Sequence, residues 1–207
     1  MRSRVNEQSG RDSLLSRGVI TMGLVMVVIT MTAFFRVPLL PKLGEDLGMS
    51  IADLGVLTTI FAAGRLLIDI PAGRLADRIR PSHLMANSAL VVGMGSFLLA
   101  AAPGPGVAYG GSLLLGVGSA LTNTTGMTYF STSVSVARRG TSVSIFAAGL
   151  LFGQAIGPTL GGFIASAGGW RIAEVAAGII AIAIATTLVG IGRAPAAVGK
   201  ASPSDTV

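Results

Sequence analysis

The 207-residue chain is 51% hydrophobic and only 12% charged, with a mean hydropathy of +0.75 and a formal net charge of +6. A soluble domain carries about 25% charged residues, so this composition excludes an ordinary soluble protein and indicates one whose solvent is lipid. The chain has no cysteine and one histidine, which excludes a disulfide framework, a thiolate metal site and a bis-histidine haem. We therefore expect no metal and no cofactor.

Six apolar runs are long enough to cross a bilayer, which takes about 20 helical residues. They are continuously apolar rather than alternating, so they predict helices and not the strands of a membrane barrel. The predicted fold class is all-α, a polytopic membrane protein with six transmembrane helices. We place the spans at roughly residues 18–40, 51–72, 84–102, 107–130, 142–166 and 172–192.

The distribution of basic residues orients these spans. With the amino terminus inside, the outer segments hold only Lys42 and Arg171. The inner segments hold eleven basic residues: Arg2, Arg4, Arg11, Arg17, Arg74, Arg78, Arg80, Arg138, Arg139, Arg193 and Lys200. Positive charge collects on the cytoplasmic side, so we expect both termini in the cytoplasm and the plasma (inner) membrane as the location. This pattern explains the basic charge through a lipid bilayer partner and argues against a nucleic-acid partner.

The predicted organisation has three parts: a cytoplasmic segment 1–17, a six-helix domain 18–192 and a disordered cytoplasmic tail 193–207. In the first outer connection, Pro38 and Pro41 are expected to loosen the end of the first span. Ser50 and Asp53 have the spacing of a capping box and predict the start of the second helix.

A charged box follows the second span, where residues 73–80 read GRLADRIR. Four charges in eight residues cannot lie in hydrocarbon, so we expect a loop at a membrane face, and three arginines favour the cytoplasmic one. The pattern resembles the signature loop between the second and third spans of the major facilitator superfamily of secondary transporters. The resemblance implies a gate: Gly73 allows a close helix approach, while Arg74, Asp77, Arg78 and Arg80 pair with neighbouring helix ends and hold the inner side closed. Alternatively, the arginines of the box only fix the orientation of the helices in the membrane, although that role would not require Asp77.

A second motif lies in the fifth span, where residues 153–162 read GQAIGPTLGG. It resembles Gly-x-x-x-Gly-Pro-x-x-Gly-Gly, a motif associated with the antiporter branch of the same superfamily. Gly153 and Gly157 share one helix face and admit a close neighbour, Pro158 is expected to kink the helix, and Gly161 and Gly162 complete the pattern. A general packing face is the alternative.

One element of the antiporter pattern is missing. The proton-coupled antiporters of the family usually carry an arginine in the fourth span, four residues before a glycine. Here Ser112 stands in that place before Gly116, which argues against proton antiport of that type.

Charged and polar residues inside the spans are candidates for substrate binding or ion coupling. Arg65 and Asp69 lie one helical turn apart and are expected to pair along one face, either to support the gate or as a proton site. Asn123 and Gln154 are candidates for lining a cavity, although hydrogen bonds between helices would explain them equally well.

Arg36 has no acid within one turn of its own span. It can bind an anionic substrate in the central cavity, as a first-span arginine does in some organic-phosphate members of the superfamily. Alternatively it can extend to the outer membrane surface or pair with an acid from another helix, such as Asp53 or Glu174.

The resemblance implies the amino-terminal six-helix half of a transporter, whose substrate lies between two such halves. We expect secondary active transport of a small organic solute, by efflux or exchange, driven by an ion gradient because the chain lacks a nucleotide-binding motif. No catalytic constellation indicates an enzyme. The second half would come from a homodimer or a separate chain. The alternative is a truncated or accessory membrane protein that does not transport.

Overall fold

The computed structural model describes residues 17–191, so nearly all of the predicted segments 1–17 and 193–207 lies outside the described residues. Within that range the chain forms helices and short connections without a strand, which confirms the all-α prediction. The helices are α2 (Arg17–Ala33), α3 (Leu40–Leu47), α4 (Ile51–Arg78), α5 (Pro81–Ala100), α6 (Pro105–Thr132), α7 (Arg139–Gly168) and α8 (Trp170–Ile191), with the 3-10 turns η1 (Val37–Leu39) and η2 (Val136–Arg138).

Six long helical segments correspond to the six predicted spans. In the described range, five have the length and hydropathy of a membrane span: Gly18–Leu47 (which includes the break after α2), Ile51–Arg78, Pro81–Ala100, Val136–Gly168 and Trp170–Val189. The remaining one, α6, is long enough but richer in glycine, serine and threonine. It packs most extensively against α4 and α5. Neighbouring helices rather than lipid therefore cover many of its small polar side chains.

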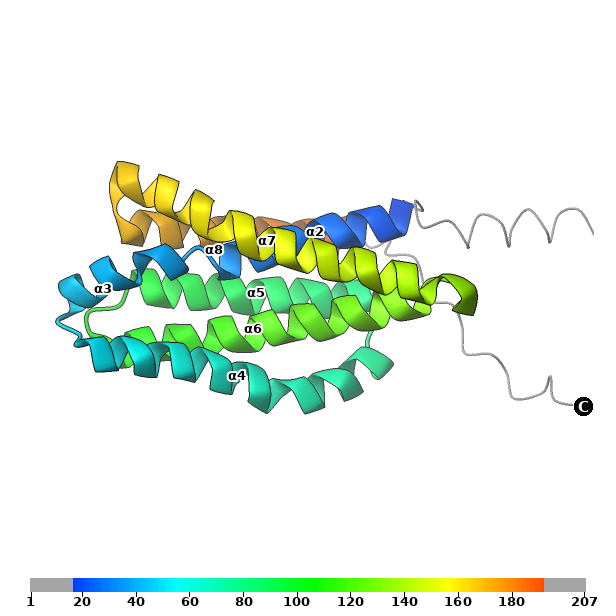
Figure 1. Ribbon diagram of the computed structural model, residues 1–207, viewed down its shortest axis with the longest axis horizontal. Helices are drawn as coiled ribbons and strands as arrows, with labels where there is room; N and C mark the ends of the chain where they lie inside the picture. The colour runs from blue at the N-terminus through cyan, green and yellow to red at the C-terminus, as the bar shows by residue number, and fades with distance from the viewer. Residues whose placement is uncertain (1–16, 192–207) are drawn as a thin grey trace, which may run out of the picture.

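The long helices lie side by side along one axis (Figure 1). In that view α4 lies along one side of the bundle and α7 along the other, with α5 and α6 between them, and α3 lies at the end opposite the start of α2. The most extensive contacts join α5 to α6, α4 to α6, α5 to α8 and α2 to α7.

The first predicted span does not continue as one helix to residue 40. The α-helix ends at Ala33, and the amides of Phe34 and Phe35 bond three residues back, to Met31 O at 3.1 Å and Thr32 O at 3.2 Å. Pro38 lacks an amide hydrogen and crowds the carbonyl four residues earlier, so the chain tightens into η1 before α3 begins.

The predicted capping box opens α4. The Ser50 hydroxyl accepts from the Asp53 amide at 3.2 Å, and the Asp53 carboxylate accepts from the Ser50 amide at 2.8 Å. These bonds satisfy amide groups that a helix start leaves free. The beginning of the second span is therefore confirmed.

The charged box is helical rather than a loop. α4 continues through Arg78, and only Ile79 and Arg80 separate it from α5. The residues before this point favour helix, and the break comes where Pro81 holds Arg80 in an extended conformation, with φ −58° and ψ 133°. The expected close approach at Gly73 was also wrong, because a methyl group there would meet nothing within 4 Å.

Three glycines of the fifth-span motif pack against the first helix and the turn after it. A methyl group at Gly153 would lie 2.7 Å from a carbonyl oxygen, and one at Gly157 would lie 2.5 Å from the next. Gly161 makes an even closer approach. The facing carbonyls belong, in order, to Val27, Met31 and Phe35. The glycines of α7 and the carbonyls that face them both advance by four residues in the same direction along the chain. The two segments therefore run parallel to each other.

This register predicts different outcomes for two glycines of α7. Gly157→Ala should destabilise the protein by about 1–3 kcal/mol, because the new methyl forces the α2 backbone away. Gly162→Ala is the matched control, because its methyl would meet only Pro38 at 3.7 Å, an ordinary contact. Thermal unfolding in detergent would compare them. Equal melting temperatures for the two variants would contradict the close contact of α2 and α7.

Candidate functional site

Arg36 lies inside the bundle, in the turn between α2 and η1. Its side chain is 4% exposed, so the alternative that it extends to the outer surface is wrong for this structure. Its Nη1 donates to the Ser112 hydroxyl of α6 at 3.1 Å, and that hydroxyl donates to the Leu57 carbonyl of α4 at 2.7 Å. The buried hydroxyl of Ser112 on α6 therefore links the turn that carries Arg36 to α4.

The ring of Phe61 on α4 is shared by two arginines. The Cζ of Arg36 lies 4.2 Å from the ring centroid, and the Cζ of Arg65 lies 6.0 Å from it. Phe34 packs edge-on against the same ring, with centroids 6.1 Å apart. Aromatic faces attract cations at such separations, so Phe61 holds two positive charges close together.

The predicted pair of Arg65 with Asp69 is not formed. Among residues 17–191, the ion pairs within 4 Å are those of Lys42 with Glu45 and Asp46. Arg65 is half-buried and lies over Phe61, four residues earlier, while Asp69 is exposed. Helix side chains lean towards the amino terminus, which carries Arg65 towards Phe61 and away from Asp69.

Glu174 on α8 is the site residue that the sequence analysis undervalued. It is 1% exposed, and Arg36 is the cation whose charge acts on its carboxyl group. The two do not form an ion pair within 4.0 Å, and Ser96 of α5 lies beside the carboxyl group. An acid inside the last apolar run was the available signal, because such residues are rare in spans.

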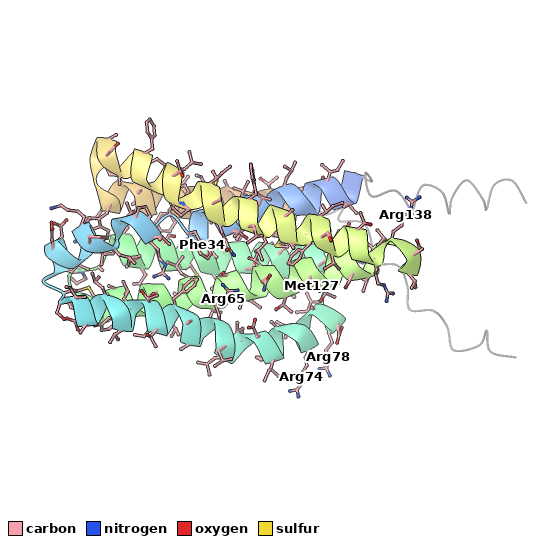
Figure 2. All side chains as sticks on the ribbon, viewed as in Figure 1. Phe34, Arg65, Arg74, Arg78, Met127 and Arg138 are labelled. Atoms are coloured by element: carbon pink, nitrogen blue, oxygen red, sulfur yellow. The ribbon has the colours of Figure 1, made fainter. Side chains whose placement is uncertain are left out.

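The predicted cavity residues are half-buried and free of internal hydrogen bonds. In the part of the chain that the structure describes, neither Asn123 nor Gln154 has a hydrogen-bond partner. Bonds between helices of this chain therefore do not account for them. Figure 2 shows Phe34, Arg65 and Met127 on the side of the bundle that faces the viewer, between α7 and α4.

Two arginines of the predicted gate lie at one end of the bundle. These are Arg74 and Arg78, and Arg138, which is not part of the predicted gate, lies at the same end, away from α3 (Figure 2). Asp77 is exposed there. Among the described residues it forms neither a hydrogen bond nor an ion pair, so this conformation lacks the pairing that the resemblance implies.

Polar contacts fix the other end, where α8 begins. The Trp170 indole donates to the Asp46 carboxylate of α3 at 2.7 Å. Arg171 lies over the Trp170 ring and donates to the carbonyls of Ala100 and Ala102 at 2.6 Å and 3.0 Å. These bonds anchor the first turn of α8, and with it Glu174, against α3 and α5.

The Arg36 contact predicts that Ser112→Ala is destabilising. Loss of the hydroxyl leaves a buried guanidinium nitrogen without its acceptor, which should cost about 2 kcal/mol. Ser119→Ala on the same helix is the control, because Ser119 is buried but has no hydrogen-bond partner in the described range. Chemical or thermal unfolding in detergent measures both, and equal losses would show that the Arg36 contact contributes nothing.

Comparison with known proteins identifies the family. The model of the Major Facilitator Superfamily matches residues 22–205. The "Probable sulfoacetate transporter SauU" of Cupriavidus necator is 26% identical over 142 residues, which cover 69% of this chain and 33% of that protein.

Two solved structures of a bacterial homologue of the human lysosomal transporter Spinster share the fold. The inward-facing, unoccupied form has a TM-score of 0.78 at 18% identity, and covers 92% of this chain and 45% of that one. The inward-facing, occupied form has a TM-score of 0.71, also at 18% identity, and covers 85% and 44%. The chain thus spans about a third of the curated relative and less than half of the solved structures. The family match over most of its length shows that the chain belongs to the Major Facilitator Superfamily.

Proposed function

We propose that this chain forms one half of a secondary transporter for a small organic anion, which binds at Arg36 and Arg65. The observation that carries the proposal is the pair of cations at the Phe61 ring, neither of which forms an ion pair with a carboxylate of residues 17–191. Unpaired cations at membrane depth are costly, and an anionic substrate would offset that cost. Arginine is suited to this role because its fork binds carboxylate, sulfonate or phosphate oxygens through two hydrogen bonds.

The relative from Cupriavidus necator supports the substrate class, since its name specifies sulfoacetate, which carries a sulfonate and a carboxylate. Sulfoacetate is therefore the first probe for this chain. An ion gradient would drive the movement, by efflux or exchange, because the sequence holds no nucleotide-binding motif. The end that carries Arg74, Arg78 and Arg138 would face the cytoplasm of the inner membrane, with both termini on that side.

A second six-helix half would complete the binding site. Members of the family bind substrate between two halves, and this chain covers less than half of the solved structures that it matches. We propose that the side with Phe34, Arg65 and Met127 faces that second half, supplied by a second copy or a separate chain.

Anion binding gives a direct test. Purified chain should be stabilised by sulfoacetate, and Arg36→Lys should weaken this binding at least tenfold, because lysine keeps the charge but loses the fork. Arg65→Gln should weaken it as well. Arg139→Gln is the control, since Arg139 is exposed at the opposite end of the bundle. The measurement is thermal stabilisation in detergent as a function of anion concentration. Parental affinity in both site variants would exclude this site.

The gate is a separate proposal, in which Asp77 pairs with a neighbouring helix end in the conformation that is closed on the inside. Asp77→Asn should then raise the labelling rate of cysteines placed at Gly73 and Arg139 by a membrane-impermeant reagent. An unchanged labelling rate in a normally folded variant would contradict the gating role of Asp77 and leave the charged box with a role in membrane orientation only.

A further inference from the structure

The two cations at the Phe61 ring are held differently. Arg36 is buried and fixed, because its Nη1 donates to the Ser112 hydroxyl at 3.1 Å. Arg65 is half-buried, and within residues 17–191 it forms neither a hydrogen bond nor an ion pair. The fork of Arg65 is therefore free for a ligand, and Arg36 has further donors beyond the one that it gives to Ser112.

The Phe61 ring is itself held in place by its neighbours. Phe61 is buried, and Gly116 of α6 lies against its backbone. Phe34 packs edge-on against the ring, with centroids 6.1 Å apart. Because cations are attracted to aromatic faces, a fixed ring determines where each guanidinium rests and offsets part of the repulsion between the two charges.

A purely structural role does not account for two charges at one ring. Arg65 and Asp69 lie one turn apart on α4, yet they do not pair. Among residues 17–191, no carboxylate oxygen lies within 4.0 Å of a nitrogen of either guanidinium. Like charges so close together repel each other, so the fold alone gains little from this placement. Two positive charges without a carboxylate beside them match the charge of a dianion.

The contacts with the ring limit how far apart the two cations lie. The Cζ atoms of Arg36 and Arg65 are 4.2 Å and 6.0 Å from the same centroid, so their separation cannot exceed the sum of these distances. With N–O distances of about 2.8 Å, an acidic group held by an arginine fork has its central atom about 4 Å from the guanidinium carbon. Two such groups leave room between them for a linker of about one or two carbon atoms.

Resting on the proposed function, we propose that the site selects dianions whose two acidic groups are joined by about one or two carbon atoms, and that Phe61 is the positioning residue that sets this preference. One acidic group binds Arg36 and the other binds Arg65. A dianion neutralises both cations, whereas a monoanion of similar size leaves one of them without a counter-ion in a place shielded from water. A longer dianion must fold back to reach both arginines, which costs conformational entropy.

Affinities for matched anions test the proposal. They are measured as thermal stabilisation of the purified full chain in detergent at neutral pH, where every carboxylate is ionised. Sulfoacetate and malonate carry two acidic groups on one carbon atom. The methyl ester of sulfoacetate keeps the sulfonate but has a single charge, and adipate separates its carboxylates by four carbon atoms. The first two should bind about tenfold more tightly than the other two, because each charged fork adds strong hydrogen bonds.

Variants identify the residues that set the preference. Arg65→Gln should remove the preference for sulfoacetate over its methyl ester. Phe61→Leu keeps an apolar side chain but loses the aromatic face, so the preference should fall by about threefold or more, while Phe61→Tyr should retain it. Phe130→Leu is the control and should match the parent, because Phe130 is a buried aromatic residue of α6 that packs against Tyr129 and Phe146.

The outcomes separate this proposal from the proposed function. Equal affinities for sulfoacetate and its methyl ester in the parent, or a preference retained by Arg65→Gln, would overturn the dianion site while anion transport stands. Adipate that binds as tightly as malonate would overturn the limit on the linker. An unchanged preference in Phe61→Leu, or an equal loss in Phe130→Leu, would overturn the role of Phe61, and a loss in Phe61→Tyr would do so if Phe61→Leu does not fold. Binding of none of these anions by the parent would overturn the proposed function as well.

Discussion

The burial of one cation, Arg36, is the constraint on which the functional end of this bundle depends. A charge in a lipid-solvated protein costs at least about 2.5 kcal/mol on insertion scales, and the surrounding residues offset only part of that cost. Ser112 accepts one hydrogen bond and Phe61 presents its ring to the guanidinium. The part of the burial cost that these contacts do not offset is the physical reason to propose that an anion binds beside Arg36.

Glycine-mediated packing brings these groups together. Gly116 on α6 lies against the backbone of Phe61, and Gly64 on α4 lies against the backbone of Leu113. Since α6 carries Ser112 and α4 carries Phe61, their close approach sets the two partners of Arg36 beside each other. The glycines of α7 hold the α2 end of the site in the same way. Without a hydrophobic drive between helices in lipid, such backbone contacts are what fix relative helix positions.

Much of the architecture could be predicted because each span is a long apolar run with charges at its ends. Local sequence patterns are enough to predict the all-α class, the six long segments and the Ser50 cap, because packing against other helices does not change these features. The ends were less predictable. The break after Ala33 precedes Pro38, and the end of α4 at Arg78 precedes Pro81, so hydropathy alone does not predict these two ends. A proline does not by itself end a helix, since Pro71 lies inside α4 and Pro158 lies inside α7.

The site was only partly predictable, because its partners are far apart in sequence. The rule that pairs residues four apart led to Arg65 with Asp69, whereas Arg65 turns back to Phe61. Ser112 was noted as the place where related antiporters carry an arginine. The structure shows that a cation does reach this position, but from the turn after α2. Arg36 and Ser112 are separated by 76 positions and give no local signal, so only the packed helices reveal that they belong together.

We propose that this chain takes part in moving an organic anion across a membrane. Reconstitution of the purified chain in liposomes, with radiolabelled sulfoacetate flux measured under imposed ion gradients, tests it most directly. Cross-linking in the same vesicles reports the oligomeric state. We expect gradient-driven flux from a dimeric or otherwise completed assembly. A monomer that shows no flux under any gradient would contradict it.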